Sequence, residues 1–367
     1  MKIIVIGAGI VGSGVAFRLA QAGAAVTVIE AGRVGGGTSG ISFAWTNANR
    51  KPPRPYHDLN VAGMRAHAAL REEFGETPWF HQHGCIEWTK PGDGTEVHEA
   101  KVEQLQSWGY AAEWISKEKL LELEPDIDPT RIGDAEIAFY AEDGWIDPVV
   151  YANAMIKAAQ SFGATLRCGT KVAGVETANG KVKGVRLADG EIVAADAVVN
   201  CAGRWADKVA EGPGLQIPLA PTVGFLVFTP PVATSVKRPL LTPDVNLRPD
   251  GAGRLMMRTG EMDTKVSIDM EPSPTMPQAL EVMKSATELL PCLAGVKPEA
   301  ARITIRPIPR DGFSAVGPAP RMEGYYFVVT HSGVTLSPFL AKAVADEVAQ
   351  GKTRPELETF RPQRFFN

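Results

Sequence analysis

The chain has 367 residues, of which 44% are hydrophobic and 22% are charged, and its formal net charge is −4. These proportions are ordinary for a globular protein that is long enough for two domains. The acidic balance leaves no broad basic surface for nucleic acid or for an anionic membrane.

The cysteines and the N-terminus bear on the compartment of the protein. The four cysteines, Cys85, Cys168, Cys201 and Cys292, lie far apart and form no CxxC pair. This spacing suits a reduced protein better than a disulfide scaffold. The apolar N-terminus does not follow a signal-peptide pattern, and no stretch approaches the roughly 18 consecutive apolar residues of a membrane helix. We therefore expect a cytoplasmic protein with no integral membrane segment and no nucleic acid partner.

The first thirty residues predict a strand, a helix and a second strand. Residues 3–6 are continuously apolar and β-branched, as in a buried parallel strand. Residues 12–22 change to helical spacing, and Gly23 is placed to end that helix. Residues 25–29 form a second apolar run with Glu30 at its carboxyl end. This order is typical of the start of a βαβ unit.

The rest of the chain predicts further helices and strands. Helices are expected over residues 58–74, 96–108, 116–123 and 147–162, and a last helix ends near residue 350. Strands are expected at residues 84–89, in three runs at 164–177, 182–190 and 191–203, and near 325–330. The proline-punctuated segment 216–305 resembles an antiparallel sheet.

The three glycines after the first strand fit the pattern GxGxxG. Gly7 permits a tight turn, Gly9 lets the backbone approach a pyrophosphate, and Gly12 lets the helix pack closely on the strand. The helix N-terminus offers N–H groups to phosphates, and Glu30 suits the ribose hydroxyls. The motif predicts an adenine dinucleotide without distinguishing NAD from FAD; a glycine-rich turn without a ligand is the alternative.

The glycine motif and the element order together predict an α/β fold. A Rossmann-like domain would be assembled from residues 1–78, 145–215 and 305–367. A discontinuous antiparallel-sheet (α+β) substrate domain would take residues 79–144 and 216–304.

Two further segments carry candidate binding residues. The glycine run ending in Thr38 and Ser39 predicts a second anion-binding nest, with an exposed loop as the alternative. The segment "RPIPRDGFSAVG" places Arg306 at the end of an alternating strand, and a guanidinium there would bind a carboxylate in bidentate fashion. The alternative is a structural salt bridge to Asp311 or to a carboxylate of the sheet. In "HSGVTLSP", Gly333 precedes a helix whose N-terminus would stabilise negative charge.

These motifs, together with "VVNCAGRWAD" and the closing "FRPQRF", resemble a known family over nearly the whole chain. The family is the D-amino-acid oxidase superfamily of FAD-dependent amine and amino-acid oxidoreductases, and the resemblance is nearest to glycine oxidases, sarcosine oxidases and D-amino-acid dehydrogenases. The resemblance implies that the Rossmann-like domain binds FAD.

The resemblance also assigns the residues around FAD. The ADP half would be held by Gly7, Gly9, Ile10, Val11, Gly12, Glu30, Ala31, Arg33, Thr38 and Ser39, with Val172 at the adenine. Ala202, Gly203 and Trp205 would line the path of the cofactor. Ala44, Trp45, Thr46 and Asn47 would lie along the flavin ring, and Gly333, Val334, Thr335 and Leu336 at its pyrimidine edge.

The resemblance further implies a reaction. Arg306 would hold the carboxylate of a small amino acid or N-substituted glycine, such as sarcosine or iminodiacetate, with Asn47 and Arg258 as further substrate contacts. The C–N bond would be oxidised by hydride transfer to flavin N5, and the imine would hydrolyse. His331 would act beside the flavin, with capping or packing as the alternative. The alternative activity is that of a D-amino-acid dehydrogenase, or of a flavoprotein subunit, that passes electrons to a quinone or partner. An NAD-binding protein without flavin also stays open. The oligomeric state stays open as well, with a homo-oligomer as one possibility.

Two departures from the sarcosine oxidases affect these expectations. Those enzymes attach FAD through a cysteine, and no cysteine follows Cys292 here, so we expect noncovalent FAD. They also use a lysine near the flavin to activate oxygen, whereas "RLMMRTG" places methionines at that position and Lys265 aligns poorly. The choice between oxygen and another electron acceptor is therefore left open.

Two residue groups allow a second interpretation. His81, His83 and Cys85 would share one face of a strand, but no fourth ligand is evident, and we predict no metal. Arg248, Arg254 and Arg258 would contact a second acidic group on the substrate, or they would lie in solvent.

Overall fold

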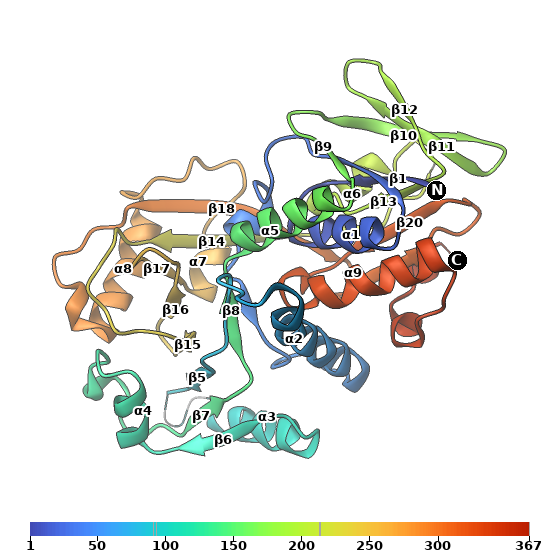
Figure 1. Cartoon of the computed structure of the whole chain (residues 1–367). Helices are drawn as coiled ribbons and strands as arrows, with labels where there is room; N and C mark the ends of the chain where they lie inside the picture. Colours follow the sequence, from blue (N-terminus) through green and yellow to red (C-terminus); the bar gives the residue numbers. More distant parts are fainter. Residues whose placement is uncertain (91, 93, 213, 367) are drawn as a thin grey trace.

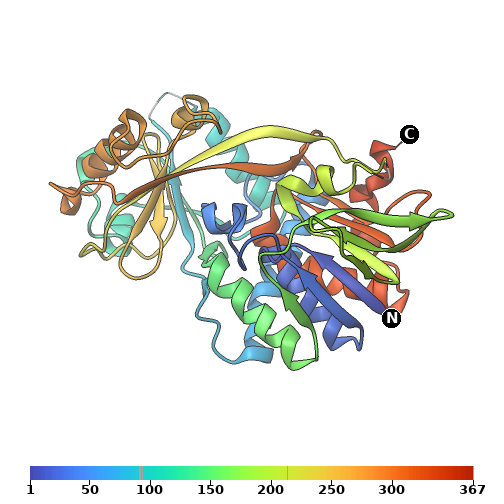
Figure 2. The same cartoon turned by 90° about the horizontal axis from the view of Figure 1, so that it is seen from above.

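The chain forms two lobes that are joined by two long strands. The computed structural model describes residues 1–90, 92, 94–212 and 214–366. Strands β14 (Leu219–Phe228) and β18 (Ala300–Pro309) pair antiparallel along their full length and run from one lobe to the other (Figures 1 and 2). They connect the sheet that carries the glycine motif with the sheet of the other lobe.

The first lobe is built on a six-stranded sheet in the order β19-β20-β13-β1-β2-β9. All neighbouring strands are parallel except β19, which is antiparallel to β20. The strands are β1 (Lys2–Ile6), β2 (Ala25–Ile29), β9 (Thr165–Arg167), β13 (Ala197–Asn200), β19 (Ala315–Pro318) and β20 (Tyr325–Val329). The chain therefore returns to one sheet from three distant parts of the sequence.

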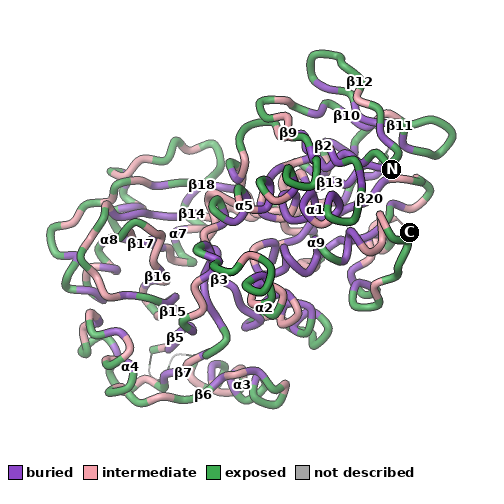
Figure 3. The backbone as a smooth tube through the Cα atoms, in the orientation of Figure 1, coloured by how far each residue is buried: buried purple, intermediate pink, exposed green. Residues whose placement is uncertain are grey.

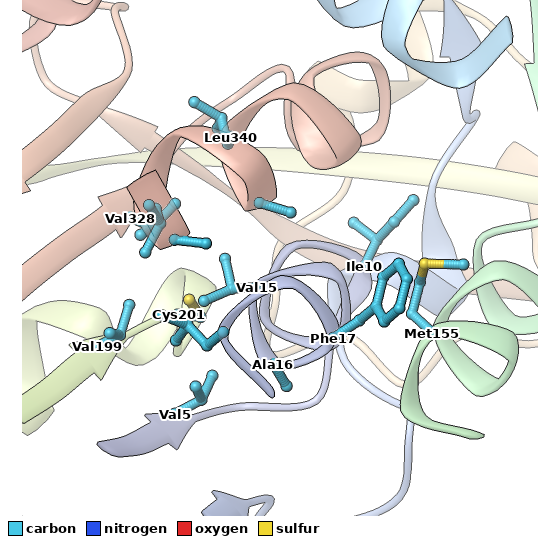
Figure 4. Close-up of a cluster of buried hydrophobic side chains, with 14 of the residues drawn as sticks. Val5, Ile10, Val15, Ala16, Phe17, Met155, Val199, Cys201, Val328 and Leu340 are labelled. Carbon is cyan, nitrogen blue, oxygen red and sulfur yellow. The ribbon is translucent and has the colours of Figure 1, made fainter. Parts of the chain in front are cut away.

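The two faces of this sheet are covered by different layers. Helices α1 (Ile10–Gln21), α5 (Pro148–Ser161) and α9 (Gly333–Gln350) cover one face, and an antiparallel sheet of β10 (Val172–Ala178), β11 (Lys181–Leu187) and β12 (Ile192–Ala194) covers the other. Alternate residues of β1 serve the two layers, because side chains along a strand point to opposite faces. Val5 packs under the helices, as Figure 4 shows, whereas Ile4 and Ile6 face the small sheet. Each fully buried aliphatic side chain contributes about 1.5–3 kcal/mol.

The second lobe is built on an eight-stranded sheet in the order β18-β14-β17-β16-β15-β5-β7-β6. Its further strands are β5 (Cys85–Trp88), β6 (Ala112–Ile115), β7 (Ile137–Tyr140), β15 (Leu240–Leu241), β16 (Asn246–Pro249) and β17 (Leu255–Arg258). Only the β5–β15 pair is parallel among the described pairs. Helix α8 (Pro277–Leu289) packs on one face, and α3 (Thr95–Ser107) packs on the part formed by β5 and β7. Two short helices, α4 (Lys117–Leu123) and α7 (Gly260–Thr264), complete the lobe.

A small third sheet and one long helix lie where the two lobes meet. The sheet has the order β3-β8-β4, with β3 (Trp45–Thr46), β8 (Gly144–Ile146) and β4 (Phe80–His81). Helix α2 (Arg54–Phe74) packs on α9, and α6 (Ala206–Val209) follows β13. Figure 3 shows the buried backbone concentrated along α1, α9 and β14, with exposed loops at the outer edges.

The α/β fold expected from the sequence is confirmed, but several element predictions need correction. The runs 164–177 and 191–203 each divide into two strands that enter different sheets, β9 and β10 in the first run and β12 and β13 in the second. Arg306 lies inside β18 and not at its end. The strand continues through two prolines because β18 is an edge strand, where a missing N–H costs no ladder bond. Helix α8 lies within the segment that the sequence predicts as a sheet.

Candidate active site

A cavity of about 880 Å³ lies at the carboxyl ends of the parallel strands. Its wall includes Ile6 at the end of β1, Ile29 at the end of β2, and Cys201 directly after β13. Ligands of open α/β sheets bind at this edge. Of the residues assigned to FAD from the sequence, the following line the cavity: Gly7, Gly9, Ile10, Val11, Glu30, Ala31, Arg33, Thr38, Ser39, Val172, Ala202, Gly203, Trp205, Gly333 and Val334.

The glycine motif has the geometry that its three positions require. Gly7 has φ +96°, and a Cβ there would lie 2.7 Å from the Cys201 carbonyl oxygen. A Cβ on Gly12 would lie 2.0 Å from the carbonyl oxygen of Gly7, so no side chain fits between α1 and the turn. Gly12 therefore serves packing and does not line the cavity, and the backbone at Gly9 forms the wall beside the N-terminus of α1.

Two polar side chains fix the rim of the cavity. The Glu30 carboxylate accepts hydrogen bonds from the amide of Ala8 at 2.8 Å and from that of Gly32 at 2.7 Å. The Ser39 Oγ accepts a hydrogen bond from the Ile10 amide at 2.9 Å, at the first turn of α1. Both groups are thus oriented before any ligand binds, which lowers the entropy cost of binding.

Thr38 connects this rim to the long strand between the lobes. Its Oγ1 donates to the carbonyl oxygen of Ile305 at 3.0 Å. Ile305 precedes Arg306 in β18, so the loop that carries Thr38 and the strand that carries Arg306 hold each other in place.

The cavity also has a cationic wall that the sequence analysis did not assign. Lys171, Arg204 and Lys208 line it in addition to Arg33. Burial lowers the pKa of Arg204, and its guanidinium lies 4.1 Å from the centre of the Trp205 ring. Trp205 is 42% exposed, so this pair lies at the mouth of the cavity. The sequence contained a signal for this cationic wall. Lys171 precedes Val172, and "AGRWADK" contains the two further cations Arg204 and Lys208.

The residues expected along the flavin ring are mostly buried. The backbone amide of Asn47 donates to the Thr335 Oγ1 at 3.3 Å, which joins β3 to the first turn of α9. The indole N–H of Trp45 donates to Asp143 at 2.9 Å. Ala44, Trp45, Thr46, Asn47, Thr335 and Leu336 do not line the cavity, and Leu336 belongs to the hydrophobic core.

Arg248 anchors the loop that leads into β3. It is 1% exposed and donates hydrogen bonds to the carbonyl oxygens of Phe43, Ser42 and Pro249. Burial is the main reason why its pKa falls to about 10. The expectation that Arg248 lies in solvent is therefore wrong, because its donors are used by backbone carbonyls. Arg254 is partly exposed and pairs with Asp250 at 3.8 Å.

At the substrate end of the site, two arginines share one carboxylate. Arg306 donates through Nη2 to the Val223 carbonyl oxygen at 2.5 Å and to Asp263 Oδ2 at 3.0 Å. Arg258 donates to the same oxygen of Asp263. The other carboxylate oxygen of Asp263 accepts from the Phe225 amide at 2.8 Å, so the acid is fixed on β14.

The alternative that Arg306 forms a salt bridge with Asp311 is wrong. Some donors of the Arg306 guanidinium also remain available. Asp311 pairs with Arg364 at 2.6 Å and not with Arg306. The acid partner of Arg306 is Asp263, which sequence reasoning missed because α7 lies far away in the chain. The Nε of Arg306 is buried without a hydrogen-bond partner among the described residues. The guanidinium therefore keeps donors for a further anion beyond the bond to Asp263.

His331 lies between the large cavity and these arginines. It lines the cavity, and burial together with repulsion from Lys51, Arg306 and Arg258 lowers its pKa to about 3. Helix α9 is capped by Ser332, so His331 lies just before the cap and does not occupy it. Its imidazole is thus neutral across the ordinary pH range.

The candidate metal ligands His81, His83 and Cys85 do not lie on one strand. His81 ends β4 and Cys85 begins β5, and these strands belong to different sheets. The His81 ring stacks on Trp145 with centroids 3.8 Å apart. The expectation that His81, His83 and Cys85 share one strand face is therefore wrong, because Gly84 at φ +81° turns the chain between the two sheets.

Comparison with known proteins places this site in a family. The sequence profile described as "FAD dependent oxidoreductase" (DAO) matches residues 2–347. The chain belongs to this family. It is FAD-dependent, and it is an amine or amino-acid oxidoreductase of the glycine oxidase and D-amino-acid oxidase type.

Individual relatives agree over the whole length. The chain is 24% identical over 372 residues to the glycine oxidase of Bacillus licheniformis, covering 98% of this chain and 96% of the relative. It shares its fold with an L-proline dehydrogenase from P. horikoshii, with a TM-score of 0.85, 24% identity and coverage of 100% and 97% of the two chains. It also resembles an iminodiacetate oxidase from Chelativorans sp. BNC1, with a TM-score of 0.83, 24% identity and coverage of 98% of each chain.

The residues around the large cavity fit FAD. The fixed carboxylate of Glu30 suits the ribose of the adenosine half, and the N-terminus of α1 together with the cations Arg33, Lys171, Arg204 and Lys208 suits a pyrophosphate. The N-terminus of α9, where Gly333 lines the wall, suits negative charge on a flavin. The cavity volume also lies within the range of roughly 300–1,000 Å³ that is usual for ligand pockets. Within the described part of the chain, no helix has the length and apolar character needed to span a bilayer.

Proposed function

We propose that the enzyme oxidises the C–N bond of a small amino acid or N-substituted glycine, with glycine, sarcosine and iminodiacetate as candidate substrates. The observation that carries this proposal is the pair Arg306–Asp263 beside the neutral His331, at the end of the FAD cavity. In this proposal, Arg306 binds the carboxylate of the substrate, and Arg258 and Asn47 are the further substrate contacts expected from the sequence. A glycine oxidase and an iminodiacetate oxidase among the similar proteins act on molecules with this unit by name.

Arg306 is suited to hold a carboxylate in one orientation. Asp263 and the Val223 carbonyl oxygen fix one nitrogen of its guanidinium, and the remaining donors make no hydrogen bond to the described residues. A carboxylate that accepts a hydrogen bond from Nε–H or Nη1–H is oriented by this fixed guanidinium plane. The α-carbon next to it is then held in one position, and such positioning supplies a large part of enzymatic rate enhancement.

The protein also favours the substrate amine in its neutral form. Lys51, Arg258 and Arg306 place positive charge around His331, which lowers the affinity of this region for an ammonium group. The neutral imidazole of His331 accepts a hydrogen bond from an amine N–H without adding charge. FAD, when bound, accepts the two electrons and the hydrogen that leave the α-carbon. The oxidised substrate is an imine, which water converts to a carbonyl compound and an amine.

We propose oxygen as the electron acceptor because similar proteins are oxidases by name, among them a glycine oxidase and an iminodiacetate oxidase, and a quinone or partner protein is the alternative. The methionines Met256 and Met257 are buried in β17, and Lys265 is bound to Glu261 on the surface. A lysine from this segment is therefore not available to assist oxygen, which favours the alternative. The similarity to an L-proline dehydrogenase favours it as well. Release of hydrogen peroxide in one-to-one ratio with substrate in air would identify an oxidase.

The test of the proposal is an anaerobic flavin-reduction screen of the purified holoenzyme. Glycine, sarcosine, iminodiacetate and D-amino acids are mixed in turn with the enzyme, and loss of flavin absorbance is followed. Reduction by a glycine derivative supports the proposal, and reduction by none of these compounds contradicts it. Release of FAD by acid precipitation tests the expected noncovalent binding in the same preparation, and gel filtration determines whether the protein is a homo-oligomer.

A further inference from the structure

A second cavity, of about 610 Å³, lies next to the substrate end and has a cationic wall. Its basic residues are Arg50, Lys51, His98 and Lys101, and Trp108 and Leu105 supply an apolar part. Two of these cations already have a counter-charge, because Arg50 and Lys101 both bind the buried carboxylate of Glu87. Glu87 is 1% exposed, and these two cations hold its pKa at about 2.

Of the lysines and arginines in this wall, Lys51 is the one that makes no ion pair with a described residue. It makes no hydrogen bond or ion pair with any described residue, and its ammonium lies 5.9 Å from the centre of the Tyr56 ring. Burial alone lowers its pKa to about 8. A partly buried ammonium without an anion is unfavourable, and an anionic ligand would remove that cost.

Lys51 also belongs to the substrate end of the large cavity. The hydroxyl of Tyr56, below the ammonium, shares a hydrogen bond of 2.8 Å with the Ser332 Oγ, and Ser332 is the neighbour of His331 in the chain. After burial, repulsion from Lys51 is the largest cause that lowers the pKa of His331. The side chain therefore lines the second cavity and is linked through Tyr56 and Ser332 to His331, which lines the large cavity.

The charges around His331 do not balance within the protein. Lys51, Arg258 and Arg306 supply three positive charges, and Asp263 supplies one negative charge. Two positive charges remain. One carboxylate on the substrate would neutralise one of them, and two carboxylates would neutralise both. Complementary charge of this kind contributes strongly to specificity.

We propose that the substrate of this enzyme is an amine that carries two carboxylates, one held by Arg306 and the other by Lys51. This inference rests on the proposed oxidation of an N-substituted glycine and narrows its substrate class. The reacting amine lies between the two carboxylates, so the preferred substrates are N-carboxymethyl amino acids and related dicarboxylic secondary amines. Their oxidation to an imine, followed by hydrolysis, gives an oxo acid and an amino acid.

The direct test measures binding without turnover. Diglycolate has an ether oxygen in place of the amine of iminodiacetate, and methoxyacetate is its counterpart with one carboxylate. Neither contains a C–N bond to oxidise. Each is titrated into the oxidised holoenzyme, and the flavin absorbance and the thermal midpoint are followed. We expect diglycolate to bind about ten- to a hundredfold more tightly than methoxyacetate, since a hydrogen bond to a charged group contributes about 1.5–3 kcal/mol.

Three variants assign the difference to Lys51. Lys51→Met should remove the preference for diglycolate and leave methoxyacetate binding within about twofold. Lys51→Arg should keep most of the preference, because it keeps the charge. Lys157→Met, at an exposed position of α5, is the matched control and should behave as the wild type. Equal binding of the two ligands by the wild type, or equal weakening of both by Lys51→Met, would overturn the proposal.

Flavin reduction separates this inference from the activity on which it rests. Iminodiacetate should reduce the flavin at concentrations about ten- to a hundredfold lower than sarcosine does, and Lys51→Met should abolish that difference. If neither amine reduces the flavin while diglycolate is still preferred, the proposed function fails and the anion subsite at Lys51 stands. If both amines reduce it equally well in the wild type, the proposed function stands and the dicarboxylate preference is refuted.

Discussion

The carboxylate of Asp263 is the part of the site whose removal has the most readily calculated effect. Its side chain is 9% exposed, and it binds Arg258, Arg306 and the Phe225 amide. Breaking a buried charge pair typically costs about 3–5 kcal/mol. Because the arginine side chains are 23% and 30% exposed, solvent reduces the loss, and we expect Asp263→Asn to lower the free energy of unfolding by about 2 kcal/mol.

The measurement is urea denaturation of the holoenzyme, supported by the thermal midpoint, which should fall by about 4 °C. Asp269→Asn, at an exposed position in the same segment, is the control and should leave both values unchanged. Asp263→Asn should also raise the sarcosine concentration that gives half-maximal flavin reduction by about tenfold, because Arg306 loses a fixed orientation. A variant with the stability and half-saturation of the wild type would refute the assignment of Asp263 as the residue that positions Arg306.

Three further outcomes follow from the cofactor domain. Gly12→Ala should destabilise the protein by about 3 kcal/mol, because the added methyl would lie 2.0 Å from the Gly7 oxygen; Gly212→Ala, where nothing lies within 4 Å, is the control in the same unfolding assay. Glu30→Gln should weaken FAD binding by about tenfold, measured from the fluorescence of released FAD, and unchanged binding would contradict its assignment to the ribose. Burial lowers the pKa of His67 to about 4, below its unfolded value of 6.5. The unfolded chain therefore takes up a proton first as the pH falls, and stability that is present above pH 6.5 is lost toward pH 4. Between pH 7.5 and 5 this loss is about 2 kcal/mol, and His67→Gln should lack it in urea titrations at the two pH values.

The sequence was most informative where local pattern and fold require the same residues. The strand, glycine turn and helix of residues 2–21 were predicted closely because burial on both faces of β1 requires a continuous apolar run, and because the turn admits only glycine at Gly7 and Gly12. The first turn of α9 was predicted for a similar reason. The helix begins at the cavity wall, where a small residue such as Gly333 is needed.

The substrate end was predicted only in part, because its contacts join residues that are far apart in the chain. Arg306 was found through its family motif, but its partner Asp263 belongs to a five-residue helix with no pattern of its own. Lys51 was missed because nothing in "NRKPPRP" distinguishes a cation beside His331 from a solvated one. The division of residues 164–177 between two sheets was missed as well, since both halves have the alternation of a strand.

The three-part construction of the central sheet has a consequence for how the protein is made. Strand β1 lies between β2, which is synthesised at once, and β13, whose outer neighbour β20 is encoded near the end of the chain. At about 5–20 residues per second, the ribosome takes roughly 15–60 s to deliver β20 and α9 after β1 has emerged. During that interval the helix-facing side of β1 and α1 lacks its main cover. Newly made chains therefore expose this apolar surface until α9 arrives, and FAD can bind its complete site only after translation of both ends of the chain.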